Sequence, residues 1–345
     1  MLALIGTIAW QTLVGLLVLG FGAWGTGALW YRAGQARGPL IGTWWAACLA
    51  GVAGMISVSP AWLWLPSGGL AGLLIWWQTI RPAHARDWAS DVARMLHVER
   101  LPPQACASPA ADIVRLHNVR NFDWRTREDF TPRWETREYD LSQIISTDLI
   151  CSYWMGPAIA HTLVSFGFAD GRYLAFSVEV RRLEGERFSA IGGLFRQCEL
   201  VVVAADEHDI VRTRSHVRGE DVYLFRVGLP AAQARALCHA YLSQAETLID
   251  HPRFYNTLTS NCTTLIYDMA KRIVPGIPWD YRLLASGYLP EYLHNLGALP
   301  GHYTMAELRR RGHIKPSSTD QDTSPDDEPA FSRSIRRHLP VAARG

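Results

Sequence analysis

The chain has 345 residues, of which 48% are apolar and 14 are tryptophan, and its formal net charge is +2. This length and composition suffice for a full globular domain, with apolar sequence left over for a membrane. The small net charge argues against a nucleic-acid-binding protein, which would carry a strongly basic surface.

The first 80 residues are apolar enough to form a transmembrane region. They contain no Asp, Glu or Lys, and their only formal charges are Arg32 and Arg37. Three apolar stretches follow one another at about 2–24, 39–58 and 61–80, each near the length that crosses a bilayer. A cleaved signal peptide followed by a buried core is the alternative. The first stretch lacks a basic n-region and two further stretches follow it, which favours membrane helices.

The number of spans and their orientation stay open from the sequence. Pro66, Gly68 and Gly69 interrupt the third stretch, so two or three helices cross the membrane. With three spans, the loop that carries Arg32 and Arg37 lies on the same side as the C-terminal domain, and the positive-inside rule would make that side cytoplasmic. Two arginines are a weak bias, however, and a long domain translocates largely regardless of its charge.

Three further regions follow the membrane region. Residues 81–112 are expected to form a basic juxtamembrane linker, which suits anionic headgroups or is simply solvated. Residues 113–312 are expected to form the catalytic domain; in it, 113–141 alternates aromatic and charged residues, which predicts short strands held by packing and ion pairs. Residues 313–345 are expected to be a flexible tail, since much of this segment is rich in Ser, Thr, Asp and Pro.

The later part of the catalytic domain shows two apolar strands and a long helix. The strands are predicted at 199–204 and 222–227. Pro230 opens a helix that runs to about Asp250, with apolar residues at helical spacing. The polar segment between the strands has no recognised metal-ligand spacing, so we expect a solvated turn and neither a metal nor a cofactor. Its titratable residues are Asp206, Glu207, His208, Asp209 and His216.

Cys262 is the cysteine whose context suggests reactivity. Ser260 and Asn261 can cap a helix that begins at Cys262, because apolar residues follow at helical spacing from Leu265 to Ile273. Backbone N–H groups and the helix dipole at that position favour a thiolate, and a nearby imidazolium would lower the thiol pKa further. We expect His161 to supply that imidazole.

The hairpin around His161 can be registered from its apolar pattern. If residues 169–171 form the loop, with Gly171 in the left-handed conformation, Val164 faces Phe176 on one continuous apolar face. The same register places His161 directly opposite Glu179. A two-residue Asp-Gly loop would instead turn His161 and Glu179 to opposite faces. The preferred register therefore predicts a triad of Cys262 as nucleophile, His161 as general base and acid, and Glu179 as the group that orients the ring.

Several short motifs in a fixed order resemble those of one family. The motifs are His117 to Asp123, Tyr153-Trp154, Ala160-His161-Thr162, Ser177-Val178-Glu179 and Asn261-Cys262-Thr263-Thr264. On these motifs, the chain from about Arg81 to its end resembles the DUF4105 family, also called the Lnb N-terminal periplasmic domain family. The resemblance implies an α+β domain that is a circularly permuted, papain-like relative of NlpC/P60 proteins, preceded here by the N-terminal transmembrane helices.

The resemblance also implies an activity and a location. Family relatives include bacterial lipoprotein N-acyltransferases, which work through an acyl-thioester on the cysteine. We therefore expect a thiol acyltransferase in the bacterial inner (cytoplasmic) membrane, multi-pass, with a periplasmic catalytic domain. Its partners would be a phospholipid acyl donor, a lipoprotein acceptor and the bilayer itself. Further candidates for binding substrate or an oxyanion are Ser165, Tyr255, Asn256 and Asn261.

Two other readings compete with acyl transfer to an amine. With water as acceptor, the same site would make the protein a phospholipase, thioesterase or amidase. In the other reading Cys262 is structural and the chain is a membrane-tethered binding module. Among the other cysteines, Cys106 and Cys151 could pair in an oxidising compartment, which the sequence does not decide.

Overall fold

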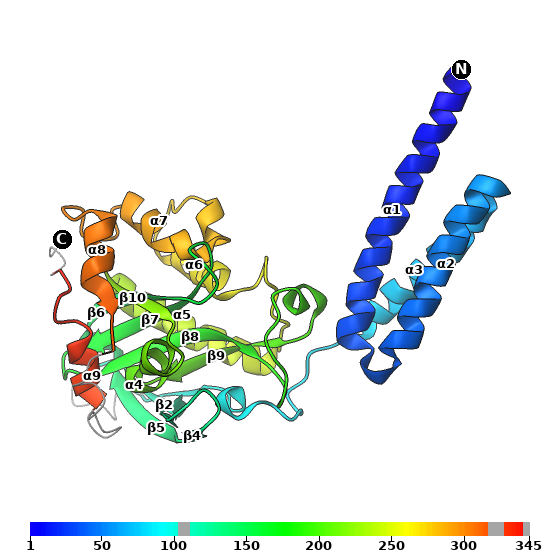
Figure 1. The fold of residues 1–345 in the computed structure, drawn as a ribbon. Coiled ribbons are helices and arrows are strands. Elements are labelled where there is room, and N and C mark those ends of the chain that lie inside the picture. Colours follow the sequence, from blue (N-terminus) through cyan, green and yellow to red (C-terminus); the bar gives the residue numbers. More distant parts are fainter. Residues whose placement is uncertain (103–110, 317–327, 341–345) are drawn as a thin grey trace. The chain divides into compact units, whose positions relative to one another are not determined.

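The computed structural model describes residues 1–102, 111–316 and 328–340 (Figure 1). Cys106 lies outside these described residues, so its pairing with Cys151 is not addressed. The chain divides into two compact units. The first comprises Met1–Arg86, Arg187–Glu199 and Phe254–Thr257, and the second comprises Asp87–Glu186, Leu200–Arg253 and Leu258–Gly345.

The first unit contains three helices, α1 (Leu2–Arg32), α2 (Arg37–Ser57) and α3 (Trp64–Thr79). Two helical segments, Leu2–Arg32 and Gly34–Ser57, are long and apolar enough to cross a membrane. Only 6% and 22% of their most apolar windows are buried, so neither is the core helix of a soluble domain. At 16 residues, α3 is shorter than a typical span. Two membrane-spanning candidates are thus present, and α3 leaves the third open.

A loop from much later in the chain packs against the ends of these helices within the first unit. Phe195 stacks on Tyr31 with ring centroids 5.8 Å apart, and Arg32 donates from Nη1 to the Arg196 carbonyl at 3.0 Å. Arg196 in turn donates to the Trp77 carbonyl at 2.6 Å. The C-terminal ends of α1 and α3 therefore meet the same loop.

A mixed sheet forms the centre of the second unit. The order is β1-β2-β9-β8-β7-β6-β10-β11, with β5 also paired to β2. The β2–β9 pair is parallel, and the other pairs with a known register are antiparallel. The strands are β1 (His97–Arg100), β2 (Ile113–Arg120), β5 (Trp134–Asp140), β6 (Ile144–Tyr153), β7 (Ala160–Phe168), β8 (Tyr173–Arg181), β9 (Glu199–Ala205), β10 (Asp221–Val227) and β11 (His313–Ile314), with a separate pair β3 (Asp123–Trp124) and β4 (Phe130–Thr131).

The helices of this unit lie in its C-terminal half, interspersed with the last strands. They are α4 (Glu207–Arg212), α5 (Ala231–Asp250), α6 (Cys262–Ile273), α7 (Leu289–Asn295), α8 (Met305–Gly312) and α9 (Glu328–Ser334). The observed β9, β10, α5 and α6 confirm the two strands and two helices predicted from the sequence in this region. The result is a mixed α+β unit, as expected.

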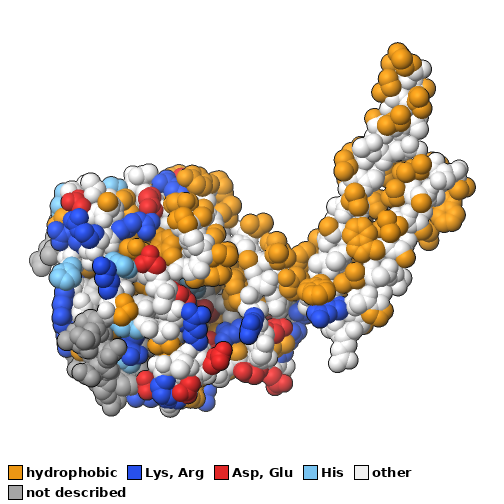
Figure 2. All heavy atoms as spheres, in the orientation of Figure 1, with side chains coloured by type: hydrophobic (Ala, Val, Ile, Leu, Met, Phe, Trp, Pro, Cys, Tyr) orange, Lys and Arg blue, Asp and Glu red, His pale blue; other side chains and the backbone are white. Residues whose placement is uncertain are grey.

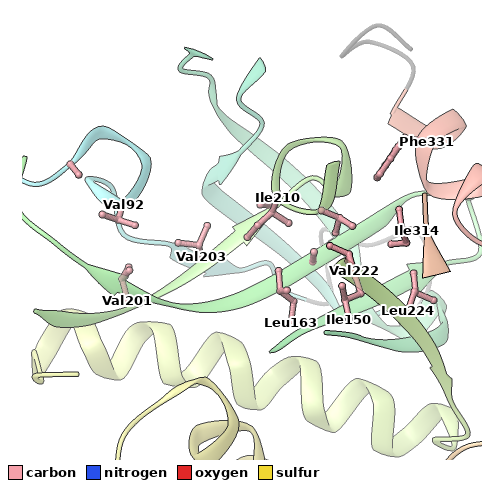
Figure 3. Close-up of a cluster of buried hydrophobic side chains, with 14 residues drawn as sticks. Val92, Ile150, Leu163, Val201, Val203, Ile210, Val222, Leu224, Ile314 and Phe331 are labelled. Atoms are coloured by element: carbon pink, nitrogen blue, oxygen red, sulfur yellow. The ribbon is translucent and has the colours of Figure 1, made fainter. Parts of the chain in front are cut away.

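Apolar side chains fill both faces of the β7–β8 hairpin. Phe166 and Phe176 contact Tyr241 of α5, with centroids 6.3 and 5.1 Å from its ring. Because side chains alternate along a strand, Leu163 and Ala175 lie on the other face. There they join a cluster that includes Val203, Val222, Ile314 and Phe331 (Figure 3). Burial on both faces fixes the register of the hairpin, since a one-residue slip would exchange the faces.

The aromatic and basic residues of 113–141 pack and pair as predicted. Phe122 lies 5.4 Å from Phe130 and 5.1 Å from Trp134, measured between ring centroids. Arg120 donates from Nε and Nη2 to the fully buried Asp209 at 2.8 and 3.0 Å. These side chains build the core and hold one buried carboxylate.

The polar segment after β9 is not the solvated turn that the sequence predicted. It forms α4 and a π-helical turn, Thr213–Val217, and its acidic residues are buried. Asp206 caps α4 and pairs with Arg137 at 3.1 Å, while Asp209 also accepts bonds from Phe122 N and Trp124 Nε1. Arginines distant in the sequence neutralise these carboxylates, which allows them to be buried.

The region boundaries also differ from those expected. Within the predicted linker, β1 pairs with β2, so the second unit begins before residue 113. In the predicted tail, β11 pairs with β10 and Phe331 is fully buried. Apolar residues on each side of the polar stretch therefore join the core of the second unit.

Candidate active site

Cys262 is the first residue of α6, and a complete capping box precedes it. The Asn261 side chain accepts from the N–H groups of Thr263 and Thr264 at 3.0 and 2.9 Å, and Thr264 Oγ1 accepts from Asn261 N at 2.9 Å. The Asn261 side chain thus accepts from the second and third N–H groups of the helix. The first N–H group, that of Cys262, takes no part in the cap. The predicted helix start is confirmed, and the thiol lies at the positive end of the helix dipole.

The hairpin has the register predicted from its apolar pattern. Val164 pairs with Phe176 and Leu163 pairs with Ser177. Gly171 has φ +88°, a conformation that a residue with a side chain rarely adopts. The paired residues of β7 and β8 run as far as Leu163 and Ser177; beyond them, hydrogen bonds from His161 and Thr162 lower the pKa of the Cys262 thiol. The first residues of β7 therefore lie next to the Cys262 thiol.

The contact between His161 and Cys262 changes the pKa of both groups. Burial alone would raise the pKa of the Cys262 thiol, but the hydrogen bond and positive charge of His161 outweigh it and lower the pKa from 9.0 to about 6. Burial and the charge of Arg214 lower the pKa of His161, yet Glu179 and the bond to Cys262 raise it to about 9. Between these values the pair is a thiolate and an imidazolium, which is the reactive form of a cysteine nucleophile.

Glu179 lies next to His161, as the register predicted. Nε2 of His161 is 3.2 Å from Glu179 Oε1 and 2.7 Å from Ser177 Oγ. Ser177 donates its own hydroxyl to Glu179 Oε1 at 2.8 Å, so it accepts from the ring. Because Nε2 is engaged in this way, Nδ1 is the ring nitrogen that remains for the thiol. Burial would raise the pKa of Glu179, but the charges of His161 and Arg214 hold it well below its usual range.

Arg214 completes the surroundings of Glu179. Its side chain is 10% exposed, and its Nη2 donates to Glu179 Oε1 at 2.7 Å. It comes from the π-helical turn that follows α4. A single carboxylate oxygen therefore receives hydrogen bonds from a serine hydroxyl and a guanidinium and lies 3.2 Å from His161 Nε2, which fixes its position.

Sequence reasoning missed Ser177 and Arg214. The signal for Ser177 was available, because it lies two residues before Glu179 on the same strand and so on the same face. Nothing in the local sequence places Arg214 near Glu179, since 35 residues separate them. Thr162, which hydrogen-bonds to the thiol through its side chain and backbone, was also missed as a site residue.

The remaining candidates make the following contacts. Asn261 caps α6, as described above. Ser165 is fully buried and donates to Glu207 Oε1 at 2.5 Å, a carboxylate that also binds Arg336. Tyr255 and Asn256 belong to the first unit, where the Tyr255 ring contacts Phe188 at 6.0 Å. None of these contacts places Ser165, Tyr255 or Asn256 at the thiol.

The described residues contain no group of three or more His, Cys, Asp or Glu side chains that could hold a metal ion. The other described cysteines differ from Cys262 in their surroundings. Burial raises the pKa of the Cys151 and Cys238 thiols, and no histidine lowers it again. The chemistry that the described site can supply is therefore nucleophilic and acid–base catalysis by its own side chains.

Arg214→Met is expected to slow the reaction at Cys262 by about 10–100-fold, the value of a hydrogen bond to a charged group. The positive charge of Arg214 lowers the pKa of His161. Its removal should therefore move the alkaline limit of the pH profile above about 9. The rate of the Cys262-dependent reaction, measured from pH 5 to 10, reports both the slower reaction and the shifted alkaline limit. Arg214→Lys keeps the charge without the planar fork and should restore the alkaline limit; an unchanged profile in Arg214→Met would contradict this role.

The family model described as the Lnb N-terminal periplasmic domain matches residues 130–287. This range contains Cys262, His161 and Glu179, together with Ser177 and Arg214. The comparisons with curated proteins and with solved structures found no match. The match and the two apolar N-terminal helices suggest a membrane-anchored protein with a periplasmic domain.

Proposed function

We propose that this protein is a membrane-anchored thiol acyltransferase. It moves a fatty acyl chain from a phospholipid, through a thioester on Cys262, to an amine. The observation that carries the proposal is the pairing of Cys262 with His161, which lowers the thiol pKa to about 6 at a capped helix N-terminus. The match to the Lnb N-terminal periplasmic domain and the apolar N-terminal helices support it.

The first half-reaction forms the acyl-enzyme. The Cys262 thiolate attacks the ester carbonyl, and the oxygen that becomes negative accepts from the Cys262 N–H at the start of α6. As the carbon–oxygen bond breaks, the His161 imidazolium gives its proton to the departing lysophospholipid oxygen. Glu179 stabilises the charged ring before this transfer and keeps its Nδ1 directed at the thiol.

The second half-reaction transfers the acyl group. An amine attacks the thioester, the carbon–sulfur bond breaks, and neutral His161 takes the proton that the amine loses. The thiolate and imidazolium are thereby restored, so the cycle balances without another reactant. The proposed amine is the N-terminal cysteine of a lipoprotein, whose own lipids hold it in the same bilayer and raise its effective concentration.

The acceptor decides between a transferase and a hydrolase. Full-length protein in proteoliposomes would receive a phospholipid with a labelled acyl chain and a diacylglyceryl-cysteine peptide. We expect label in an amide on the peptide, and none from Cys262→Ser. Free fatty acid that forms at the same rate with and without peptide would replace the transferase with a phospholipase. Equal amide formation by Cys262→Ser would remove Cys262 from the mechanism.

A further inference from the structure

Large apolar side chains gather at the end of the second unit where β7 begins. Figure 2 shows hydrophobic side chains on the part of this unit that carries α6 and α7 in Figure 1. Trp279 and Tyr281 are 65% and 63% exposed, and Trp154 and Met155 are 47% and 52% exposed. We call these four residues and Leu284, which is 39% exposed, the apolar rim.

Two segments far apart in the sequence are joined to form the rim. Ser286 donates from Oγ to the Ala160 carbonyl at 2.6 Å and accepts from Ala160 N at 3.0 Å. The Gly287 N–H donates to the Ala158 carbonyl at 3.0 Å, and the Gly287 carbonyl accepts from Tyr153 Oη at 2.6 Å. The approach at Gly287 is close enough that a Cβ there would lie 2.1 Å from the Pro157 carbonyl oxygen. The loop before β7 and the segment after α6 thus form one surface.

This surface adjoins the catalytic residues. Ala160, which is bonded to Ser286, immediately precedes His161 in β7. Trp279 and Tyr281 follow α6, and the Tyr292 hydroxyl holds their segment by donating to the Pro278 carbonyl at 2.6 Å. The bonds between Ser286 and Ala160 therefore join the end of the rim segment to the strand that carries His161.

The charged side chains of the rim segment, Asp280 and Arg282, neutralise each other. Arg282 lies between Tyr281 and Leu284 and donates to both carboxylate oxygens of Asp280, at 2.8 and 2.9 Å. A partner that depends on electrostatic attraction would not be selected by such a surface. Trp and Tyr with few net charges are instead typical of the boundary between lipid headgroups and acyl chains.

We propose that the apolar rim inserts into the headgroup and acyl boundary of the bilayer and admits a phospholipid acyl chain to Cys262. The N-terminal helices tether the chain to a bilayer, so this partner is always at high effective concentration. Insertion also keeps the acyl chain out of water on its way to a thiol that is only 9% exposed. This inference deepens the proposed function and rests on it, because the rim would admit the acyl donor that the proposed function requires.

Photochemical labelling tests the contact without using the reaction. Full-length protein would be reconstituted in phosphatidylcholine vesicles with a phospholipid that carries a diazirine in its acyl chain. After irradiation, peptides with Trp154 and Met155 and peptides with Trp279 to Leu284 should carry lipid, as should those of α1 and α2. Ile145 is the matched control, since it is 69% exposed but lies at the other end of β6. Labelling confined to the N-terminal helices, equal labelling at Ile145, or cross-links between two copies through the rim would overturn the proposal.

A kinetic comparison separates the rim from the proposed chemistry. The double variant Trp279→Ser, Tyr281→Ser should use bilayer phospholipid at least about tenfold more slowly, because two anchoring side chains are lost. Alkylation of its Cys262 by iodoacetamide should be unchanged, and Ile145→Ser should match the wild type in both assays. Cys262→Ala should keep the wild-type lipid labelling. Rim labelling without acyl transfer would overturn the proposed function alone, and acyl transfer without rim labelling would overturn the rim alone.

Discussion

His161→Gln is expected to slow acyl transfer by about 10²–10⁴-fold, the usual contribution of a positioned acid and base. The same change should raise the pKa of the Cys262 thiol above its ordinary 9.0, because burial raises it and the opposing charge is gone. Alkylation of Cys262 by the neutral reagent iodoacetamide, followed by peptide mass spectrometry, measures this pKa. The wild-type rate should rise with pH around a midpoint of about 6, where the thiolate forms.

His239→Gln is the matched control for this experiment. His239 lies on α5 and also faces a carboxylate, with its Nε2 2.7 Å from Asp112 Oδ2. Its variant should keep the wild-type midpoint and rate. A midpoint that stays near 6 in His161→Gln would show that His161 does not stabilise the thiolate.

Arg336→Met is expected to lower the free energy of unfolding by about 3–5 kcal/mol, the cost of leaving a buried charge without its partner. Arg336 donates from Nη1 and Nη2 to the fully buried Glu207 at 2.7 and 2.6 Å, and from Nε to Asp148 at 2.9 Å. Asp148 retains Arg226, whereas Glu207 keeps the Ser165 and Ser332 hydroxyls and loses its positively charged partner. Thermal unfolding of the full-length protein in detergent should show a midpoint about 10 °C lower.

Neighbouring residues supply the controls for Arg336. Arg337 is the next residue and is exposed, so Arg337→Met should unfold at the wild-type temperature. The double variant Arg336→Met, Glu207→Gln removes the unpaired charge and should recover much of the loss. If Arg336→Met unfolded like the wild type, the C-terminal segment would not be part of the folded unit.

The C-terminal segment also contacts the elements that position Arg214 beside Glu179. The Phe331 ring lies 6.2 Å from the His208 ring and 5.8 Å from the His216 ring, measured between centroids. Arg336 binds Glu207 at the start of α4. These contacts are made at both ends of the segment that carries Arg214, and Arg214 binds Glu179. The C-terminal segment thereby supports the position of the carboxylate beside His161.

The sequence was sufficient to place His161 opposite Glu179, because the rule involved is local. Side chains alternate along a strand, and only one loop length puts the apolar residues of the hairpin on one face. The start of α6 was predictable for the same reason, since Asn261 caps the helix within three residues of itself. Local patterns therefore predicted the start of α6 at Cys262 and the pairing of His161 with Glu179.

The buried ion pairs could not be predicted in this way. Asp209 pairs with Arg120 across 89 residues, and Glu207 pairs with Arg336 across 129. Without the fold, a run of Asp, Glu and His indicates a solvated turn, because unpaired charges are costly to bury. Arg214 was missed for the same reason, since 35 residues separate it from Glu179. The boundaries at 81–112 and 313–345 were misplaced because β1 and β11 each need a partner strand from elsewhere in the sheet.

The central claim is that Cys262 carries an acyl group during the reaction. Intact mass spectrometry of the full-length protein, after incubation with phospholipid and no acceptor, tests this most directly. The proposal predicts a mass increase of one acyl group that hydroxylamine removes, located on Cys262 and absent from Cys262→Ala. An unmodified wild-type protein under conditions where iodoacetamide readily alkylates Cys262, or an adduct of equal amount in Cys262→Ala, would contradict it.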